Sequence, residues 1–301
     1  MQIRGCALAN KSRFNALTNK QSSFREALYR FSTYRLALVG LVVIALVVCI
    51  AVFARWLAPL GPTDLSLEEV MNPPGNGHLF GTDDVGRDVW ARVAYGARTS
   101  MIVGLGAVTI ALLIGTTVGL LSGFFGKWTD AVLMRITDGV MSVPPLILVI
   151  VFISIVGPSL LSVVVVIALT TWPTSARLVR GQVLTLREQE YVVAAQVVGV
   201  PTRKILTRHL FPNLLGPLSV VATFGISNAI LVEAGLSFLG LGVRPPAASW
   251  GQMVNLAQQP DILLDKPWIW VPSAVMIVIT VLAINFIGDG LRKAVDPKSV
   301  R

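Results

Sequence analysis

The segment from Gly81 to Asp88 is the first part of this sequence whose residues could do chemistry. Its two glycines, followed by Arg87, have the spacing of a loop that binds nucleotide phosphates. However, Asp83 and Asp84 stand where the negatively charged phosphates would lie, and Asp88 replaces the hydroxyl residue that holds the metal ion. We therefore expect no nucleotide site and no bound cofactor in this chain, so any ATP and Mg²⁺ would be bound by partner subunits.

A second candidate is Glu233, which ends a long apolar segment and follows Ser227 and Asn228 by less than two helical turns. A carboxylate at the centre of a membrane helix costs about 2.5 to 3.5 kcal/mol, so it normally faces a polar cavity or a partner. Two roles stay open: these three residues line a pathway across the membrane, or Glu233 is a solvated acid at the membrane surface.

The two histidines, His78 and His209, have no partner at catalytic or metal-binding spacing in the sequence. No serine, histidine and acid set or pair of carboxylates can be assembled on one side of a membrane. Cys6 and Cys49 indicate neither a disulfide framework nor a metal site. We predict no catalytic residue and no metal site, so the chain is not itself an enzyme.

The third candidate is the segment 185–213, which reads as a helix, a turn and a second helix. Thr185 and Glu188 have the spacing of a capping box, which predicts a helix over 186–198 with Glu190 in its first turn. Gly199 is a typical stop signal for such a helix.

The second helix of this segment is predicted over 202–210 and is basic, since it carries Arg203 and Lys204. Phe211 and Pro212 are predicted to end it. A helix pair with a basic second member also fits a helix-turn-helix that binds DNA, so the surroundings of the segment have to decide.

Composition places the chain in a membrane. Hydrophobic residues make up 54% of it, charged residues 14%, and the mean hydropathy is +0.71, which is too apolar for a soluble domain. We predict an all-α protein with six transmembrane helices. Gly157 to Ser159 marks the turn between the third and fourth, and Pro144 and Pro145 should bend the third. The predicted spans are 36–54, 99–126, two within 139–176, 210–232 and 267–288.

Lysine and arginine gather before residue 36, between 177 and 208, and after 291, whereas the segment 59–98 is mainly acidic. With six spans these basic regions share one side, which predicts that both termini are cytoplasmic. The segment 185–213 would then be fixed at the bilayer by both ends, which leaves no room for a duplex, and we predict no nucleic-acid partner. The predicted divisions are a basic tail 1–35, a first transmembrane helix 36–58, an extracytoplasmic segment 59–98, and a core domain 99–301 with the loop 185–213.

Gly115, Gly119 and Gly123 recur at every fourth residue of the second span. Small residues at this spacing allow two helix backbones to approach closely. The pattern fits a packing seam inside one subunit or an interface between subunits.

The loop 185–213 also resembles the EAA loop of ABC-importer permeases, whose pattern is EAA-x3-G-x9-I-x-L-P. Ala194, Ala195, Gly199 and Pro212 match this pattern. The sequence departs from it at three positions, where Val193, His209 and Phe211 stand for the glutamate, isoleucine and leucine.

Further segments resemble the second, C-type permease of dipeptide, oligopeptide and nickel importers, so that the resemblance extends from about Leu36 to the C-terminus. They are Phe80 to Asp88, Leu236 to Gly242, Pro245 to Gly251, and Asn285 to Arg292 with Asp296 and Pro297. This resemblance implies the fold of a type I ABC-importer permease in the bacterial cytoplasmic (inner) membrane.

The resemblance further implies a set of partners: a second homologous permease, two cytoplasmic ATPases, an extracytoplasmic solute-binding protein and membrane lipid. It assigns coupling to the ATPase to the loop, through Glu190, Ala194, Ala195, Gly199, Arg203, Lys204, His209 and Pro212. Peptide is the expected substrate, with nickel or glutathione as the alternatives within the family. Remote alternatives are a stand-alone secondary transporter and the membrane-tethered DNA-binding regulator.

Overall fold

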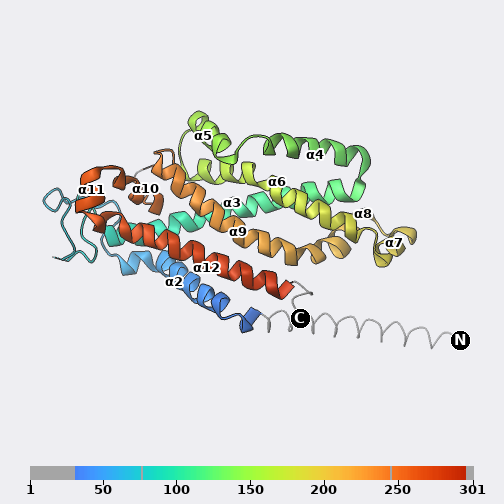
Figure 1. The fold of residues 1–301 in the computed structure, drawn as a ribbon, viewed down its shortest axis with the longest axis horizontal. Coiled ribbons are helices and arrows are strands. Elements are labelled where there is room, and N and C mark those ends of the chain that lie inside the picture. Colours follow the sequence, from blue (N-terminus) through green and yellow to red (C-terminus); the bar gives the residue numbers. More distant parts are fainter. Residues whose placement is uncertain (1–30, 76, 245, 296–301) are drawn as a thin grey trace.

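The protein is an elongated bundle of long helices with short helices at both ends (Figure 1). The computed structural model describes residues 31–75, 77–244 and 246–295. Within these residues the elements are helical, apart from two isolated β-bridges, Gly75 to His78 and Thr82 to Asp88. The all-α prediction is confirmed.

The helices follow one another with short connections. They are α2 (Arg35–Leu57), α3 (Val89–Phe125), α4 (Lys127–Met141), α5 (Pro145–Val156), α6 (Leu160–Leu186), α7 (Glu190–Val197), α8 (Thr202–Lys204), the π-helix η1 (Ile205–Leu210), α9 (Phe211–Phe238), α10 (Trp250–Asn255), η2 (Leu256–Gln258), α11 (Pro260–Asp265), η3 (Pro267–Ile269) and α12 (Val271–Val295).

Five of the helical runs are long and apolar enough to cross a membrane: α2, α3, α6, the run from Thr202 to Phe238, and α12. The pair α4 and α5 makes a sixth if it is counted as one broken span, bent by 83°. The bend lies where Pro144 and Pro145 were predicted to produce it, because proline cannot continue the helical hydrogen bonds of the preceding turn. The turn predicted at Gly157 is confirmed, since α5 ends at Val156 and α6 begins at Leu160.

Helix α3 already begins at Val89, within the segment 59–98 that was predicted as extracytoplasmic. Asp88 caps this helix, its carboxylate accepting a hydrogen bond from the amide of Ala91 at 2.6 Å. A search for charge-free spans excludes Arg92 from the second predicted span. In the structure Arg92 is part of α3, is 2% exposed and pairs with Asp83. This ion pair offsets part of the free-energy cost of burying the charge of Arg92.

The core of the bundle is formed by α3, α6 and α9, and the glycine seam is internal to it. Gly119 packs so tightly on α6 that an added Cβ would lie 2.6 Å from the Cβ of Val179, and at Gly123 the Cβ of Val183 would be 2.8 Å away. Of the two possibilities for this pattern, the structure supports the seam inside one subunit.

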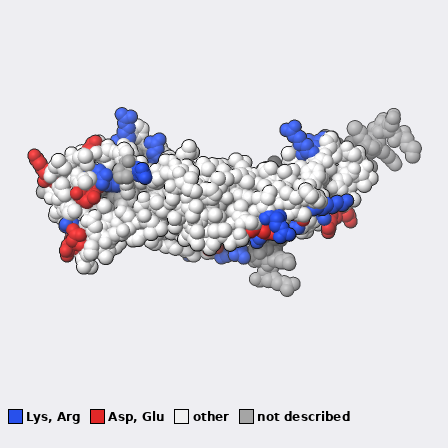
Figure 2. All heavy atoms as spheres, turned by 90° about the horizontal axis from the view of Figure 1, so that it is seen from above, with Lys and Arg blue, Asp and Glu red and all other residues white. Residues whose placement is uncertain are grey.

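Charged side chains lie toward the two ends of the molecule, and on the face seen in Figure 2 the middle carries none. One end, which we call the loop-rich end, holds residues 58–88 and 239–270. The other, the α7 end, holds residues 123–130 and 186–210. A charge-free band between two charged ends is the surface expected of a protein that spans a bilayer.

Candidate functional site

Helix α7 is a short helix held against the bundle by one face only. Val192 is fully buried and packs in a cluster with Ile205, Leu210 and Leu214 from η1 and α9. Ala195, one turn later, is half-buried against the same cluster. The helix therefore has a fixed inner face, and its other residues are free to meet something else.

The outer face of α7 is apolar although it faces away from the bundle. Val193 is 43% exposed, Val197 82% and Val198 81%. Together with Glu188, Glu190 and Ala194 these valines line a shallow hollow of about 440 Å³. Exposed apolar side chains that adjoin one another and are bordered by charges mark an interaction surface.

The structure brings most of the predicted coupling residues to the surface of the α7 end. Glu190, Ala194, Gly199, Arg203 and Lys204 are exposed. Gly199 follows the helix with φ of +79°, which is the left-handed conformation expected of a glycine after a helix end.

The other three predicted coupling residues are half-buried. Ala195 faces the buried cluster, and Pro212 lies in the first turn of α9. His209 is half-buried in η1, with its ring 6.4 Å from that of Tyr191. Val197, which matches no conserved letter of the EAA pattern, is more exposed than any of these.

The predicted capping box is wrong. Thr185 lies inside α6, and its hydroxyl donates to the carbonyl of Gly181 one turn back. Helix α6 runs on to Leu186 because Val179 and Val183 continue to pack on the glycines of α3. The helix predicted over 186–198 is thus observed as α7, Glu190–Val197.

The prediction that Phe211 and Pro212 end the second helix is also wrong. The chain stays helical from Thr202 to Phe238, through the π-helix η1. Proline lacks an amide hydrogen and its ring clashes with the preceding turn, and the wider turns of a π-helix directly before Pro212 relieve this conflict. The second helix is therefore the beginning of a span, and it does not form a separate recognition helix.

Ion pairs and a cap tie the α7 end to the neighbouring helices. Arg180 of α6 donates two hydrogen bonds of 2.6 Å to Asp130 of α4. Arg187, directly after α6, donates to the carbonyl of Gly123 near the end of α3 at 2.9 Å. These contacts join the ends of α3, α4 and α6 directly before the chain enters α7.

A hollow of about 300 Å³ lies between α3, α6 and α9, in the part of the molecule that spans the membrane. Most of its lining is apolar, but Thr171 and Thr174 of α6 and Asn228 of α9 bring polar groups to it. Thr174 and Asn228 are exposed, although the helices around them are apolar. Exposed polar side chains at this depth indicate a surface that meets water or a polar solute.

The other two predicted pathway residues lie inside the subunit. Ser227 is buried and donates weakly, at 3.5 Å, to the carbonyl of Val281 on α12. Glu233 is fully buried and accepts hydrogen bonds from Ser237 at 2.7 Å and from Ser100 at 3.4 Å. Glu233 is therefore neither a solvated surface acid nor part of an open wall.

The loop from Gly81 to Asp88 turns several of its hydrogen-bond donors toward one of its own carboxylates. The carboxylate of Asp83 accepts hydrogen bonds from the amides of Val85 and Arg87, at 3.0 and 2.9 Å, and from the Arg87 side chain at 2.7 Å. The donors that would hold a phosphate in a nucleotide-binding loop are thus taken by a carboxylate of the chain itself.

His78 has two partners that sequence spacing did not reveal. Its Nδ1 lies 2.7 Å from Asp88, and its Nε2 lies 3.1 Å from Glu69. The hydrogen bond with Asp88 raises the pKa of His78 above its ordinary value of 6.5, with a smaller contribution from Glu69 and partial opposition from burial. Among the described residues no group of three or more possible ligands is arranged to hold a metal ion.

Most of the chain matches known protein families. Residues 115–301 match the family described as binding-protein-dependent transport system inner membrane component. Residues 22–74 match the N-terminal TM domain of oligopeptide transport permease C.

Comparison with individual proteins agrees with the family match. A putative peptide permease protein of Brucella suis is 46% identical over 83% of this chain and 82% of its own length. The dipeptide transport system permease protein DppC of Alkalihalophilus pseudofirmus is 41% identical over 92% of this chain and 90% of its own length.

A solved structure of the MetNI methionine ABC transporter, described as inward facing, is similar in fold. It superposes with a TM-score of 0.53 and 22% sequence identity, over 68% of this chain and 96% of the matched chain.

Proposed function

This chain belongs to the family of binding-protein-dependent transport system inner membrane components, and we propose that it is the permease subunit that forms one half of a peptide pathway in an ATP-driven importer. It is a multi-pass protein of the inner membrane. The observation that carries the mechanism is the apolar outer face of α7.

We assign this face to the docking of a cytoplasmic ATPase subunit. Val197 and Val198 expose four fifths of their surface, although α7 lies beyond the membrane-spanning band. Burying an exposed valine gains about 1.5 kcal/mol or more, so these side chains favour a partner with an apolar groove. Two such ATPases, which also bind the ATP and Mg²⁺, complete the machine together with this chain and its homologous partner.

The charges of the α7 end support its placement on the cytoplasmic side. Arg203 and Lys204 lie exposed at the start of the helical run that becomes the fifth span. Basic residues next to a span favour the cytoplasm, where they also meet anionic lipid. Both termini then share this side, and the loop-rich end faces outward to an extracytoplasmic solute-binding protein.

The hollow beside Asn228 is the proposed wall of the pathway. A peptide carries backbone amides and carbonyls, which need hydrogen-bonding partners when they leave water. Asn228 and Thr174 offer a donor and acceptors at the middle of the bundle. The second permease subunit would cover the open side, so the pathway lies between the two subunits, and Ser227 and Glu233 are left out of it.

The proposed motion starts at α7. Closure of the ATPases on ATP shifts this helix, and α9 follows because the chain is helical without a break from Thr202 to Phe238. Movement of α9 changes the hollow beside Asn228, so the pathway opens outward and, after hydrolysis, inward. Transport by such alternating access depends on α7 as a link to the ATPases.

Peptide is preferred as the substrate over nickel and glutathione. The relatives of Brucella suis and Alkalihalophilus pseudofirmus carry peptide and dipeptide in their names. The described residues contain no group of three or more metal ligands, and the hollow beside Asn228 offers amide and hydroxyl groups. These groups suit a peptide backbone.

The decisive experiment puts a large side chain on the outer face of α7. In Ala194→Trp the indole would occupy the hollow that receives the ATPase. We expect the reconstituted importer to lose peptide uptake and the ATPase stimulation produced by loaded solute-binding protein, each by at least about tenfold.

The matched control is Ala45→Trp, an equally large change at an exposed alanine of α2. It should leave both activities close to those of the native protein. Native uptake and native stimulation in Ala194→Trp would overturn the assignment of α7.

A further inference from the structure

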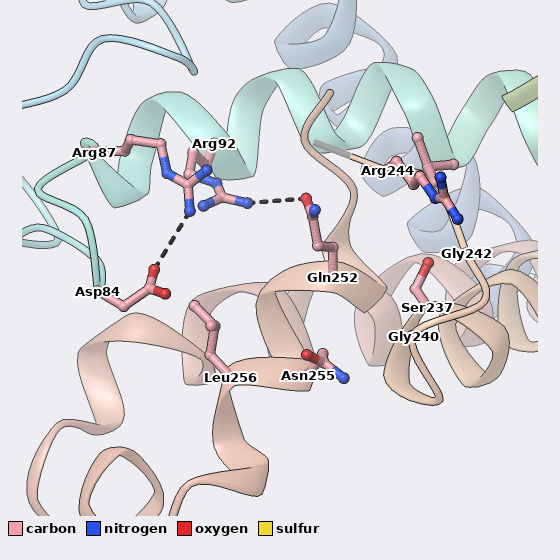
Figure 3. Close-up of a pocket in the computed structure, with 11 residues that line it drawn as sticks. Asp84, Arg87, Arg92, Ser237, Gly240, Gly242, Arg244, Gln252, Asn255 and Leu256 are labelled. Carbon is pink, nitrogen blue, oxygen red and sulfur yellow. Dashed lines mark hydrogen bonds and ion pairs between the residues drawn. The ribbon is translucent and has the colours of Figure 1, made fainter. Parts of the chain in front are cut away.

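A second cavity, of about 290 Å³, lies at the loop-rich end and has a different chemistry from the hollow beside Asn228. It is bounded by the end of α9 and the loop that follows, by α10, and by the loop before α3 (Figure 3). Three guanidinium groups line it, from Arg87, Arg92 and Arg244, and one carboxylate, from Asp84.

The floor of this cavity is a buried charge cluster. Arg92 is 2% exposed and is held by Asp83 and by the amide oxygen of Gln252, the latter at 3.0 Å. Asp83 also binds the side chain of Arg87 at 2.7 Å, so two guanidinium groups share one buried carboxylate. The Nε of Arg92 has no hydrogen-bond partner among the described residues. The floor is therefore fixed in position and short of negative charge.

The rim carries two charged groups that are held less firmly by ion pairs than the groups of the floor. Arg244 is exposed and has no ion-pair partner among the residues that the structure describes. Asp84 is on the other side of the cavity in the view of Figure 3, and among the described residues its one ion pair is a long one of 3.4 Å to Arg87. The two rim groups are thus available to a ligand that carries both signs of charge.

We propose that this cavity is a receiving site for short zwitterionic peptides, in which Arg244 binds the terminal carboxylate and Asp84, on the other side of the cavity, binds the terminal ammonium. The proposal rests on the proposed function, since it names the part of the permease that meets the free termini of a peptide when the solute-binding protein releases it. Guanidinium groups bind carboxylates through paired, charge-assisted hydrogen bonds, so the carboxylate dominates recognition.

The size of the cavity agrees with such a ligand. Pockets for small molecules begin at about 300 Å³, and two or three extended residues span about 7 to 11 Å. Gly240 on the rim leaves open space, because an added Cβ there would meet nothing within 4 Å. Gln252 and Asn255 of α10 place amide groups beside the peptide backbone.

The test is direct binding of radiolabelled tri-alanine to the assembled importer in lipid nanodiscs, measured by equilibrium dialysis without the solute-binding protein. We expect saturable binding that weakens about tenfold or more when the terminal carboxylate is replaced by an amide, because a hydrogen bond to a charged group is lost. An N-acetylated peptide should lose less. Arg244→Gln should weaken tri-alanine binding about tenfold, and Arg244→Lys should restore part of it.

The matched control is Arg55→Gln, an exposed arginine at the end of α2 that lies outside the cavity. Equal binding of the peptide and its amide, or native binding in Arg244→Gln, would overturn the proposal. The proposal would also be overturned if Arg244→Gln weakened the binding of the solute-binding protein and left the binding of the peptide unchanged. Arg244 would then pair with a carboxylate of that protein. Peptide uptake by the complete importer is measured in parallel, and its absence would count against the proposed function rather than this site.

Discussion

The two ends of this molecule differ in which side chains they bury and which they expose. The loop-rich end and the helix segments next to it bury three charged side chains: Asp83, Arg92 and Glu233 are at most 2% exposed, and each has a defined hydrogen-bond partner. The α7 end leaves its apolar groups in the open, with Val197 and Val198 more than 80% exposed. At one end buried charges find partners within the subunit, and at the other exposed apolar side chains are left for a partner subunit to cover.

This difference indicates that the two ends differ in rigidity. Buried and satisfied polar networks fix one arrangement, since any other leaves a charge without a partner. A short helix anchored by Val192 and Ala195 can shift at much lower cost. The rigid end can therefore hold a binding geometry while the α7 end moves.

The largest expected effect concerns Asp83. Asp83→Asn leaves the buried guanidinium of Arg92 without its counter-charge, which should lower the free energy of unfolding by about 3 to 5 kcal/mol. Thermal unfolding of the purified chain in detergent measures this loss. Asp84→Asn, where the carboxylate is partly exposed and only loosely paired, is the matched control and should change little. Equal midpoints for the two variants would show that the buried ion pair of Asp83 and Arg92 does not stabilise the loop-rich end.

Two glycines with the same backbone conformation offer the next comparison. Gly86 has φ of +80° and Gly199 has φ of +79°. Gly199→Ala should cost about 1 kcal/mol, the strain of the left-handed conformation, because its Cβ would meet nothing within 4 Å.

Gly86→Ala adds an overlap with the carbonyl oxygen of Ser66, which should cost about 1 to 3 kcal/mol more. The same unfolding measurement compares the two variants. If Gly199→Ala were as damaging as Gly86→Ala, the α7 end would be as tightly packed as the loop-rich end.

A pair of valines on α7 separates stability from coupling. Val197→Ser should reduce ATP-driven uptake about tenfold, because docking loses an apolar contact, with a change in stability of less than about 0.5 kcal/mol. Val192→Ser, at the buried anchor, should instead destabilise the chain by about 1 to 2 kcal/mol. Uptake and unfolding are measured on both variants, and an unfolding defect in Val197→Ser would show that its side chain is part of the fold.

The smallest effect is a pH dependence confined to the loop-rich end. Since the folded-state pKa of His78 is raised, its ion pairs with Asp88 and Glu69 stabilise the fold fully below pH 6.5, and this stabilisation is lost as pH rises through the folded-state value. Limited proteolysis of the segment 62–80 should quicken as pH rises from 6 to 9. In His78→Gln the rate of cleavage within 62–80 should not rise with pH in this way. Cleavage within 186–200 should show no such pH dependence in either protein.

Long apolar segments made most of the spans predictable. The helix expected over 36–58 is observed at Arg35–Leu57, because a charge-free run bounded by arginines has few alternatives in a membrane. The start of α3 was missed because Arg92 is charged in the sequence, and only the fold brings Asp83 to it.

The coupling loop shows what local signals miss. Thr185 and Glu188 form a valid capping pattern, but the packing of α6 on α3 carries the helix past it. The same limit applies to the cavities: Arg244 and Asp84 are far apart in the chain and meet around one space only in three dimensions. Residue types predicted which groups could act, and tertiary contacts decided which of them lie together.

The unbroken run from Thr202 to Phe238 can work as a lever. Pro212 and Pro217 each remove one helical hydrogen bond, so bending concentrates near the α7 end and the remainder moves as a rod. That rod, from Leu218 onward, is about 30 Å long, so a tilt of about 10° carries its tip through about 5 Å. The tip is tied to the arginine-lined cavity, because Asn255 and Gln258 both donate to the carbonyl of Phe238. A small push at the coupling loop is thereby carried along the rod to the far end, which is displaced as one unit because its polar network is fixed.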